Sequence, residues 1–375
     1  MNLWLNRLQR MSRATNQHNK PPRKAASVVR YRRRLELLSL VFSLAFSIAR
    51  AADPVDRDLI PEARAVLKFL ESVYGKKTLS GIWDSKAAEQ IKQVSGHYPA
   101  VQSFDLTGWN SPTWGPTYTP VVQEYADKAK AWWAKGGIVA MQFHWKNPLK
   151  PDGTAWLDRP PGHWTFDVSK ALQTGTDENK AVMEDLRHHA DYLKLLADAH
   201  VPVLWRPLHE IDGGWFWWTD QKHPENTAAL WRLMFDYLVK ERKLHNLIWV
   251  YSAGLHALGE TENIAIRKLF YPGADYVDIA GIDIYQNDWF KWQQPWEDTY
   301  AKAFEIMQKV APGKMLALAE CSAIPDPDKM EKTGPKWLYC LPWWGVCKDH
   351  PEEWMRKTYS HPCVITLDGL PLWRR

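Results

Sequence analysis

The residues best suited to acid–base chemistry lie in the stretch Val201 to Trp218, VPVLWRPLHEIDGGWFWW. It begins as an apolar, β-forming run and ends in a charged and aromatic cluster, which predicts a buried strand running out into a loop. Alternate residues of a strand share a face, so we expect Arg206, Leu208 and Glu210 to point the same way, with the guanidinium beneath the carboxylate. A buried ion pair would explain both charges. The aromatic residues directly after Glu210 favour a sugar-binding site instead, because flat rings stack on sugars.

A second carboxylate, Glu320, ends the otherwise apolar run KMLALAE. A carboxylate at this position does not belong to a packed core, so we expect it to face the open end of the strand. Glu320 follows Glu210 by 110 residues, or three βα units with some loop growth. That spacing predicts strands four and seven of one sheet. Alone, Glu320 would fit a structural or capping carboxylate equally well; with Glu210 it forms a pair suited to catalysis.

Two further strand ends carry polar side chains. The run GGIVAMQFHWKNP contains His144 and Trp145, and the run DIAGIDIYQND places Asp283 and Tyr285 on one face. A histidine after an apolar strand is commonly a structural imidazole that bonds locally. Asp283 could likewise bond neighbouring backbone, and Tyr285 could be a ring at the rim. The pattern alone leaves the structural and the functional interpretations open.

The run WRPLHE, followed by two glycines and WFWW, resembles the acid/base signature of glycoside hydrolase family 26, mostly endo-β-mannanases on a (β/α)8 barrel. The motif is long and contains rare residues, so it is more specific than a lone His-Glu pair. His209 agrees with this family, whereas the wider clan usually has Asn before the acid. The HW..NP run at His144 and the tyrosine motif at Tyr285 also resemble the family pattern.

This resemblance implies a retaining mechanism. Glu320 would attack the anomeric carbon, and Glu210 would protonate the leaving oxygen and then deprotonate the incoming water. We expect Glu210, beside Trp215, to be held protonated, and Glu320, near Arg206 and Tyr285, to stay ionised.

The resemblance also implies contacts with the sugar around the mouth of the barrel. His144 would contact the sugar at the cleavage point, Tyr285 would bond the nucleophile, and His209 would bond the sugar or orient Glu320. Further substrate-binding candidates are Trp145, Trp164, Arg206, Trp215, Asp283 and Trp343, with Trp344 as the alternative to Trp343.

The rest of the chain supplies elements that would hold these residues. We predict strands over Thr78 to Gly81, Ala100 to Asp105, Ile138 to His144, Val201 to His209, Leu247 to Ser252, Asp278 to Ile284, Met315 to Glu320 and Trp337 to Leu341. Predicted helices include Pro61 to Tyr74, Val122 to Lys135, Asn179 to Ala199, Ala228 to Arg242, Thr299 to Val310 and Glu352 to Tyr359. Alternating strands and helices predict an α/β fold, a (β/α)8 TIM barrel, as one domain over residues 52–375.

The first 51 residues have a different character. Residues 1–34 hold ten Lys or Arg and no acid, and the apolar run Leu35 to Ile48 and then Ala49-Arg50-Ala51 follow. This order predicts a signal peptide over residues 1–51, cleaved near Ala51. The apolar run is shorter than the roughly 20 residues of a spanning helix. We therefore expect a secreted or periplasmic protein without stable membrane insertion.

Removal of this leader reverses the net charge. The whole chain carries +5, but residues 52–375 hold 37 basic and 42 acidic residues, a net charge of −5. The basic character belongs to the leader, so we expect no nucleic-acid partner. Twenty-three tryptophans suit an extended carbohydrate site better than one small pocket.

Four cysteines, Cys321, Cys340, Cys347 and Cys363, lie near the end of the chain. In an exported protein they can oxidise, and of the three possible pairings we favour Cys340 with Cys347, which closes the shortest loop. Zinc is the competing interpretation, but no CxxC pair accompanies them, and we expect neither a metal nor a cofactor.

The expected partner is a polysaccharide of the β-mannan type, bound by a monomer. β-1,3-xylanase and β-glucanase specificities occur in the same family and remain alternatives. A non-catalytic carbohydrate-binding barrel is an alternative of another class. The presence of both carboxylates together with Arg206, His209 and Tyr285 argues against it.

Overall fold

A computed structural model of the chain describes residues 53–83, 85–105, 118–150, 154–157, 166–254, 260–285, 296–322, 324–343 and 351–373. Contacts divide the chain into Met1–Ile48 and Ala49–Arg375, and every described residue belongs to the second unit. The expected signal peptide over residues 1–51 lies outside the described residues, as do Trp164, Trp344 and Cys347.

Eight parallel strands close into a ring. Their order is β2-β3-β4-β5-β6-β7-β8-β1, β1 pairs again with β2, and a short strand β9 adds beside β1. The strands are β1 Thr78–Ile82, β2 Val101–Asp105, β3 Ile138–Gln142, β4 Val203–Arg206, β5 Leu247–Gly254, β6 Ile279–Ile284, β7 Met315–Cys321, β8 Tyr339–Pro342 and β9 Val364–Ile365. The predicted (β/α)8 barrel is confirmed.

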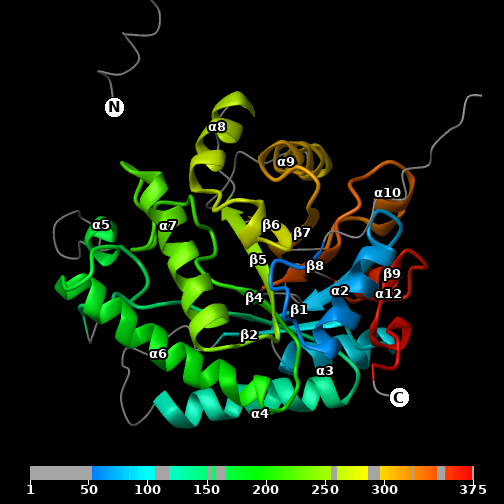
Figure 1. The fold of residues 1–375 in the computed structure, drawn as a ribbon. Coiled ribbons are helices and arrows are strands. Elements are labelled where there is room, and N and C mark those ends of the chain that lie inside the picture. The colour runs from blue at the N-terminus through cyan, green and yellow to red at the C-terminus, as the bar shows by residue number, and fades with distance from the viewer. Residues whose placement is uncertain are drawn as a thin grey trace, which may run out of the picture. The chain divides into compact units, whose positions relative to one another are not determined.

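Helices surround this sheet and cover its outer face (Figure 1). They are α2 Pro61–Val73, α3 Ser85–Ser95, α4 Tyr118–Ala134, α5 Val168–Ala171, α6 Asp177–Ala197, α7 Pro224–Phe235, α8 Glu260–Phe270, α9 Trp296–Val310, α10 Pro327–Lys332 and α12 Glu352–Tyr359. A π-helical turn, Asp236–Glu241, extends α7, so the predicted helix Ala228 to Arg242 is two kinds of helix in succession.

Residues at the amino-terminal ends explain where two of these helices begin. Pro61 starts α2, because its missing N–H would be unpaired at that position anyway. The Thr176 side chain caps α6 by accepting from the Asn179 N–H, and Asp177 and Glu178 stand in the first turn, where the helix dipole favours acids.

Strand β4 is shorter than the predicted run Val201 to His209. Pro202 and Pro207 flank its four residues, and proline has no N–H for a ladder. After Pro207 the backbone turns, and Leu208 and Glu210 take positive φ angles of 47° and 49°. Strand alternation therefore ends at Arg206. The expectation that Arg206, Leu208 and Glu210 share one face is wrong.

Strand β7 contains a bulge that decides where Glu320 points. Its neighbour β6 pairs Ile282 with Leu318 but pairs the next residue, Asp283, with Glu320. Ala319 is therefore the extra residue, and regular alternation, which would put Glu320 on the face of Leu318, is interrupted. Glu320 lies instead beside Asp283.

The described cysteines are free thiols buried in the protein. Cys340 is 0% exposed within β8, and the expected Cys340–Cys347 disulfide is wrong because Cys340 is unpaired.

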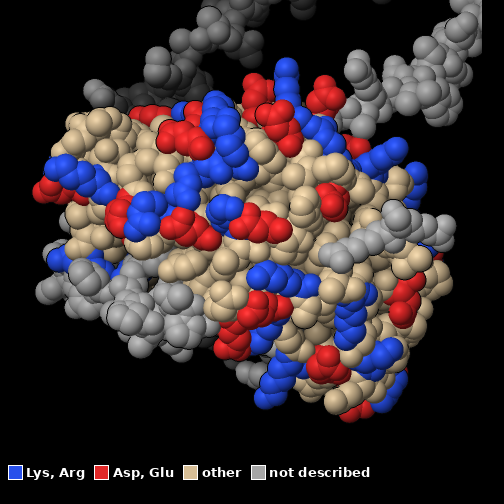
Figure 2. All heavy atoms as spheres, turned by 60° about the horizontal axis from the view of Figure 1, so that its bottom comes forward, with Lys and Arg blue, Asp and Glu red and all other residues tan. Residues whose placement is uncertain are grey.

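The surface shown in Figure 2 mixes basic and acidic side chains without a large field of one sign. On α6, for example, Arg187 contacts both Glu184 and Asp191, and Lys194 contacts Asp198. Such a face lacks the basic stripe that binds nucleic acids. No helix in the described ranges combines the length and the apolar character that a membrane crossing requires.

Candidate active site

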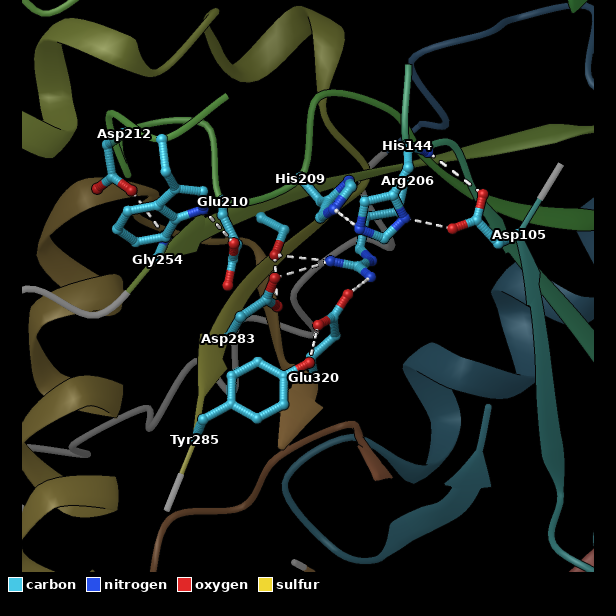
Figure 3. Close-up of polar contacts among 12 residues, drawn as sticks. Asp105, His144, Arg206, His209, Glu210, Asp212, Gly254, Asp283, Tyr285 and Glu320 are labelled. Carbon is cyan, nitrogen blue, oxygen red and sulfur yellow. Dashed lines mark hydrogen bonds and ion pairs between the residues drawn. The ribbon is translucent and has the colours of Figure 1, made fainter. Parts of the chain in front are cut away.

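Three carboxylates meet where the carboxyl ends of β4, β6 and β7 lie. One oxygen each from Glu210, Asp283 and Glu320 lies within 4.8 Å of the other two (Figure 3). Asp283 and Glu320 are 2% and 4% exposed, whereas Glu210 keeps some exposed surface. The carboxyl ends of barrel strands carry the functional residues of such folds.

Arg206 is the counter-charge of this cluster. Its Nη1 donates to Asp283 at 2.8 Å, and its Nη2 donates to Glu320. The guanidinium thus bonds the carboxylates of β6 and β7. The expectation that it lies beneath Glu210 is wrong. Burial acts to lower the pKa of Arg206, but the two carboxylates raise it above its usual value, so the side chain stays charged.

Ser252 at the end of β5 completes the support of Asp283. The Ser252 hydroxyl donates to Asp283 at 2.7 Å and accepts from Arg206 at 3.3 Å. Burial raises the pKa of Asp283 to about 7, against the opposing charge of Arg206. Asp283 is therefore a buried structural partner of the guanidinium.

Two hydrogen-bond donors hold the Glu320 side chain. Arg206 donates to one of its oxygens, and the Tyr285 hydroxyl donates to the other. Burial and the nearby charge of Glu320 raise the pKa of Tyr285 well above its usual value, so this hydroxyl keeps its proton and can donate it in the bond. Both oxygens of Glu320 therefore accept a hydrogen bond, and the side chain is fixed in one orientation.

Glu210 has the opposite environment. Burial, followed by the charges of Asp283 and Glu320, raises the pKa of Glu210 well above its usual value. Its contact with Trp215, whose Nε1 donates to Oε2 at 2.5 Å, lowers the pKa only in part. The two glutamates thus differ in their hydrogen-bond partners, and the raised pKa of Glu210 suits a proton donor.

The loop after Glu210 is shaped to bring Trp215 to this carboxyl. A Cβ at Gly213 would lie 2.4 Å from the Trp215 ring, so only glycine fits there. Asp212 fixes the loop to its neighbours, because it accepts from the Gly254 N–H at 2.7 Å and pairs with the buried Arg267 of α8.

His144 and His209 lie side by side next to this cluster, with ring centroids 4.4 Å apart. Their Nε2 atoms are 3.2 Å apart, and the His144 Nδ1 bonds the buried Asp105 at the end of β2. Burial lowers the pKa of His209 well below its usual value, so His209 is neutral. Both ring nitrogens of His144 are engaged by protein groups.

The predicted tryptophans occupy different environments. Trp145 is 1% exposed, donates to Asp185 of α6 at 2.8 Å and packs on the Trp217 ring. The structure therefore places the Trp145 ring in the core, and its expected contact with a sugar stays a prediction. Trp343 lies at the mouth, 6.0 Å from the His144 ring and 4.9 Å from Trp83 at the end of β1.

Sequence reasoning missed Asp105, Ser252 and Trp83. The sequence contains a pattern that indicates Asp105 and Ser252 as site residues. Each is a polar residue that ends a predicted apolar strand, as Glu320 does. Trp83 lies two residues after the predicted first strand and directly follows β1.

Three clustered carboxylates are also a donor set for a divalent cation. Here the Arg206 guanidinium provides the positive charge and bonds two of the three. The arrangement fits a pair of carboxyl groups acting on a bond placed between them.

Comparisons with known proteins agree with the resemblance seen in the motifs. The model of Glycosyl hydrolase family 26 matches residues 55–369. A mannan endo-1,4-beta-mannosidase of Thermothelomyces thermophilus is 34% identical over 83% of this chain and 62% of its own length. Mannan endo-1,4-beta-mannosidase B of a Piromyces species is 30% identical over 83% of this chain and 52% of its own. The chain thus spans between half and two thirds of these relatives.

The fold matches solved structures over most of the chain. The beta-mannanase of a symbiotic protist of the termite Reticulitermes speratus, complexed with a gluco-manno-oligosaccharide, superposes with a TM-score of 0.73 at 34% identity. The match covers 86% of this chain and 98% of that one. The Podospora anserina GH26-CBM35 beta-(1,4)-mannanase gives 0.70 at 29% identity, over 86% and 69% of the two chains. With the family model matched along nearly all of the described barrel, the chain belongs to glycosyl hydrolase family 26.

Proposed function

We propose that the chain is a retaining endo-β-1,4-mannanase that cleaves mannan, galactomannan or glucomannan. The observation that carries the proposal is the pair Glu210 and Glu320, with oxygens within 4.8 Å of each other and with the pKa of Glu210 raised well above its usual value by burial. Retaining enzymes hold their two carboxyl groups about 5–5.5 Å apart, and inverting enzymes about 6.5–9.5 Å. The names of the relatives support mannan as the substrate.

In the first step, an oxygen of Glu320 attacks the anomeric carbon. The bond to the leaving sugar breaks, and the Glu210 proton passes to the departing oxygen. Arg206 and Tyr285 hold Glu320 with the attacking oxygen in place. The raised pKa of Glu210 keeps its proton available near neutral pH.

In the second step, Glu210, now ionised, takes a proton from water. The resulting hydroxide oxygen attacks the anomeric carbon and releases the Glu320 carboxylate. The two inversions give net retention. Glu210 is then protonated again and Glu320 is ionised, as at the start.

Azide rescue tests this assignment. We expect Glu320→Ala to abolish hydrolysis, and added azide to restore cleavage of an activated aryl β-mannoside with an α-mannosyl azide as product. Glu210→Ala with azide should give the β-azide, because the nucleophile is intact. Glu184→Ala, at an exposed glutamate of α6, is the control and should keep full activity. Full activity of Glu320→Ala would overturn the proposal.

A substrate panel separates mannanase from the related specificities. Release of reducing sugar from galactomannan, glucomannan, β-1,3-xylan and mixed-linkage glucan should be fastest with the mannans. Preference for β-1,3-xylan or glucan would keep the mechanism and change the substrate. Binding of a mannan without cleavage would favour a non-catalytic barrel.

We also propose that the chain is exported through its leader. The basic residues, the apolar run and Ala49-Arg50-Ala51 support this, and a polysaccharide substrate is found outside cells. Amino-terminal sequencing of the exported protein should begin near Ala52. Full-length protein retained in the cell would contradict it.

A further inference from the structure

We propose that Asp105 is a positioning residue. It fixes the protons on the imidazoles of His144 and His209, and this pair holds the strained turn that presents Glu210. The inference rests on the proposed function in so far as Glu210 is the acid, and it names a residue that acts on Glu210 only through others.

The contacts form a continuous chain from β2 to β4. Asp105, 0% exposed, accepts the His144 backbone N–H on Oδ1 at 3.2 Å and bonds the His144 Nδ1 with Oδ2. The His144 Nε2 lies 3.2 Å from the His209 Nε2. Figure 3 shows these three side chains and their contacts, and Glu210 follows His209 in the sequence.

The chain of contacts dictates where the protons lie. A carboxylate only accepts, so the His144 Nδ1 carries a proton. In neutral His144 the Nε2 is then an acceptor, and the His209 Nε2 must be the donor. The His209 Nδ1 is left as a lone pair, and this atom is buried with no hydrogen-bond partner among the described residues. A buried acceptor is tolerated there more readily than a buried N–H, which proteins almost never leave unpaired.

The contact between the two imidazoles stabilises the backbone turn at residues 208–210, which has unfavourable φ angles. His209 stands between Leu208 and Glu210, whose φ angles of 47° and 49° are unfavourable for side chains of that size. Strained residues persist only where their surroundings hold them. The His209 side chain is held by His144, and its carbonyl accepts from the Trp218 Nε1 at 3.3 Å. Loss of either tie would free the turn that carries Glu210.

Asp105→Asn tests the proton positions directly. The single carbonyl oxygen of asparagine is needed by the His144 backbone N–H, so its NH2 group faces the His144 Nδ1. That nitrogen must then accept, the His144 proton moves to Nε2, and the His209 proton moves to Nδ1. An isosteric change would thus invert both tautomers and leave a buried N–H without a partner.

We expect two results from this variant. The ¹⁵N spectra of histidine-labelled protein, assigned with single histidine variants, should show exchanged protonated and unprotonated ring nitrogens in both residues. The kcat on mannan should fall on the order of 100-fold with KM nearly unchanged, the low end of what acid–base positioning contributes. A carboxylate-to-amide change of this kind costs a serine protease about 10⁴-fold.

The chain contains a matched control. Asp56 accepts the Asp58 backbone N–H at 2.9 Å with one oxygen and bonds the His245 Nδ1 at 2.9 Å with the other. His245 precedes β5, at the end of the barrel opposite the carboxylates. Asp56→Asn should invert the His245 tautomer and leave kcat and KM unchanged.

Unchanged histidine spectra in Asp105→Asn would overturn the proposal, as would inverted tautomers with full kcat. A lower melting temperature of Asp105→Asn with unchanged kcat would mean that Asp105 contributes only to stability, which would also overturn the proposal. If wild-type protein cleaves no β-glycan, the proposed function fails, and the spectra still decide whether Asp105 sets the protons.

Discussion

Glu210 and Glu320 are the same chemical group in two surroundings. Glu320 receives hydrogen bonds on both oxygens from Arg206 and Tyr285. Glu210 has one donor, Trp215, and burial together with nearby carboxylates opposes its ionisation. The division of work between acid and nucleophile is therefore set by neighbours contributed by four different strands and loops.

Trp215→Phe should move the alkaline limb of the pH profile of kcat/KM. The acid must be protonated, so activity falls as pH rises through the pKa of Glu210. The Trp215 N–H stabilises ionised Glu210, and without it the pKa rises further. The limb should therefore move to higher pH. Trp217→Phe, which loses a bond to the Trp145 carbonyl, is the control. A limb moved to lower pH would show that the ring acts mainly by excluding water.

Asp185→Asn should stabilise the protein at neutral pH relative to acid. Burial raises the pKa of Asp185 to about 7, from an ordinary value of 3.8. The folded state therefore holds a proton that the unfolded chain releases, and the wild type loses stability as pH rises from about 4 to 7, by at most about 1.4 kcal/mol per pH unit. Asparagine has no charge to bury and can still accept from Trp145. Denaturant unfolding at pH 5 and pH 8 measures this, and a difference between the proteins that is constant with pH would contradict it.

At the scale of elements, short strands and irregular strand ends position the site. Pro207 ends β4 directly after Arg206, and the bulge at Ala319 in β7 turns Glu320 toward Asp283. Both irregularities lie at the carboxyl ends of strands, where side chains leave the packed barrel. The regular parts of the strands form the barrel, and the irregular strand ends set the directions in which the carboxylates point.

Gly281→Ala should destabilise the barrel at the β6–β7 contact. A Cβ at Gly281 would lie 2.6 Å from the Ala319 Cβ and 3.0 Å from the Tyr251 carbonyl oxygen. We expect a loss of about 1–3 kcal/mol in the free energy of unfolding. Gly281→Ala with Ala319→Gly should recover part of it, because the nearer clash is removed. Strictly additive losses in this double-mutant cycle would show that the two positions do not interact.

At the scale of the whole barrel, the end of the chain reinforces the closure. β9 pairs with β1, with Thr78 opposite Val364. β1 is also the strand that closes the barrel, because it pairs with both β8 and β2. Beyond it, Trp373 contacts Phe69 of α2 and Trp133 of α4 and donates to the Gly136 carbonyl at 2.8 Å. The last residues thus connect helices that are separated in sequence.

Trp373→Ala should lower stability without changing catalysis. The ring is partly exposed, so we expect a loss of about 2 kcal/mol, below the roughly 3–5 of a core tryptophan. Its contacts lie on the outer helices, and kcat/KM should remain that of the wild type. Leu372→Ala, at a side chain that is 77% exposed, is the control and should be neutral. Reduced kcat/KM in Trp373→Ala would link the tail to the site.

Local patterns in the amino-acid sequence predicted the strands, the helices and the chemical groups that they carry. Alternating apolar strands and amphipathic helices predicted the eight-stranded barrel, because burial periodicity is a local property of the chain. Strand-end positions predicted that Glu210 and Glu320 face one opening, and the motif around Glu210 indicated the family.

How these groups contact one another depends on the folded arrangement of distant segments. The partners of Arg206 lie on β6 and β7, 77 and 114 residues away, and no local pattern encodes that choice. The β7 bulge sets the face of Glu320, and the burial of Trp145 depends on Asp185 of α6. Register, bulges and buried polar pairs are settled by contacts between distant segments, because each is stable only when the partner strand or helix is already in place.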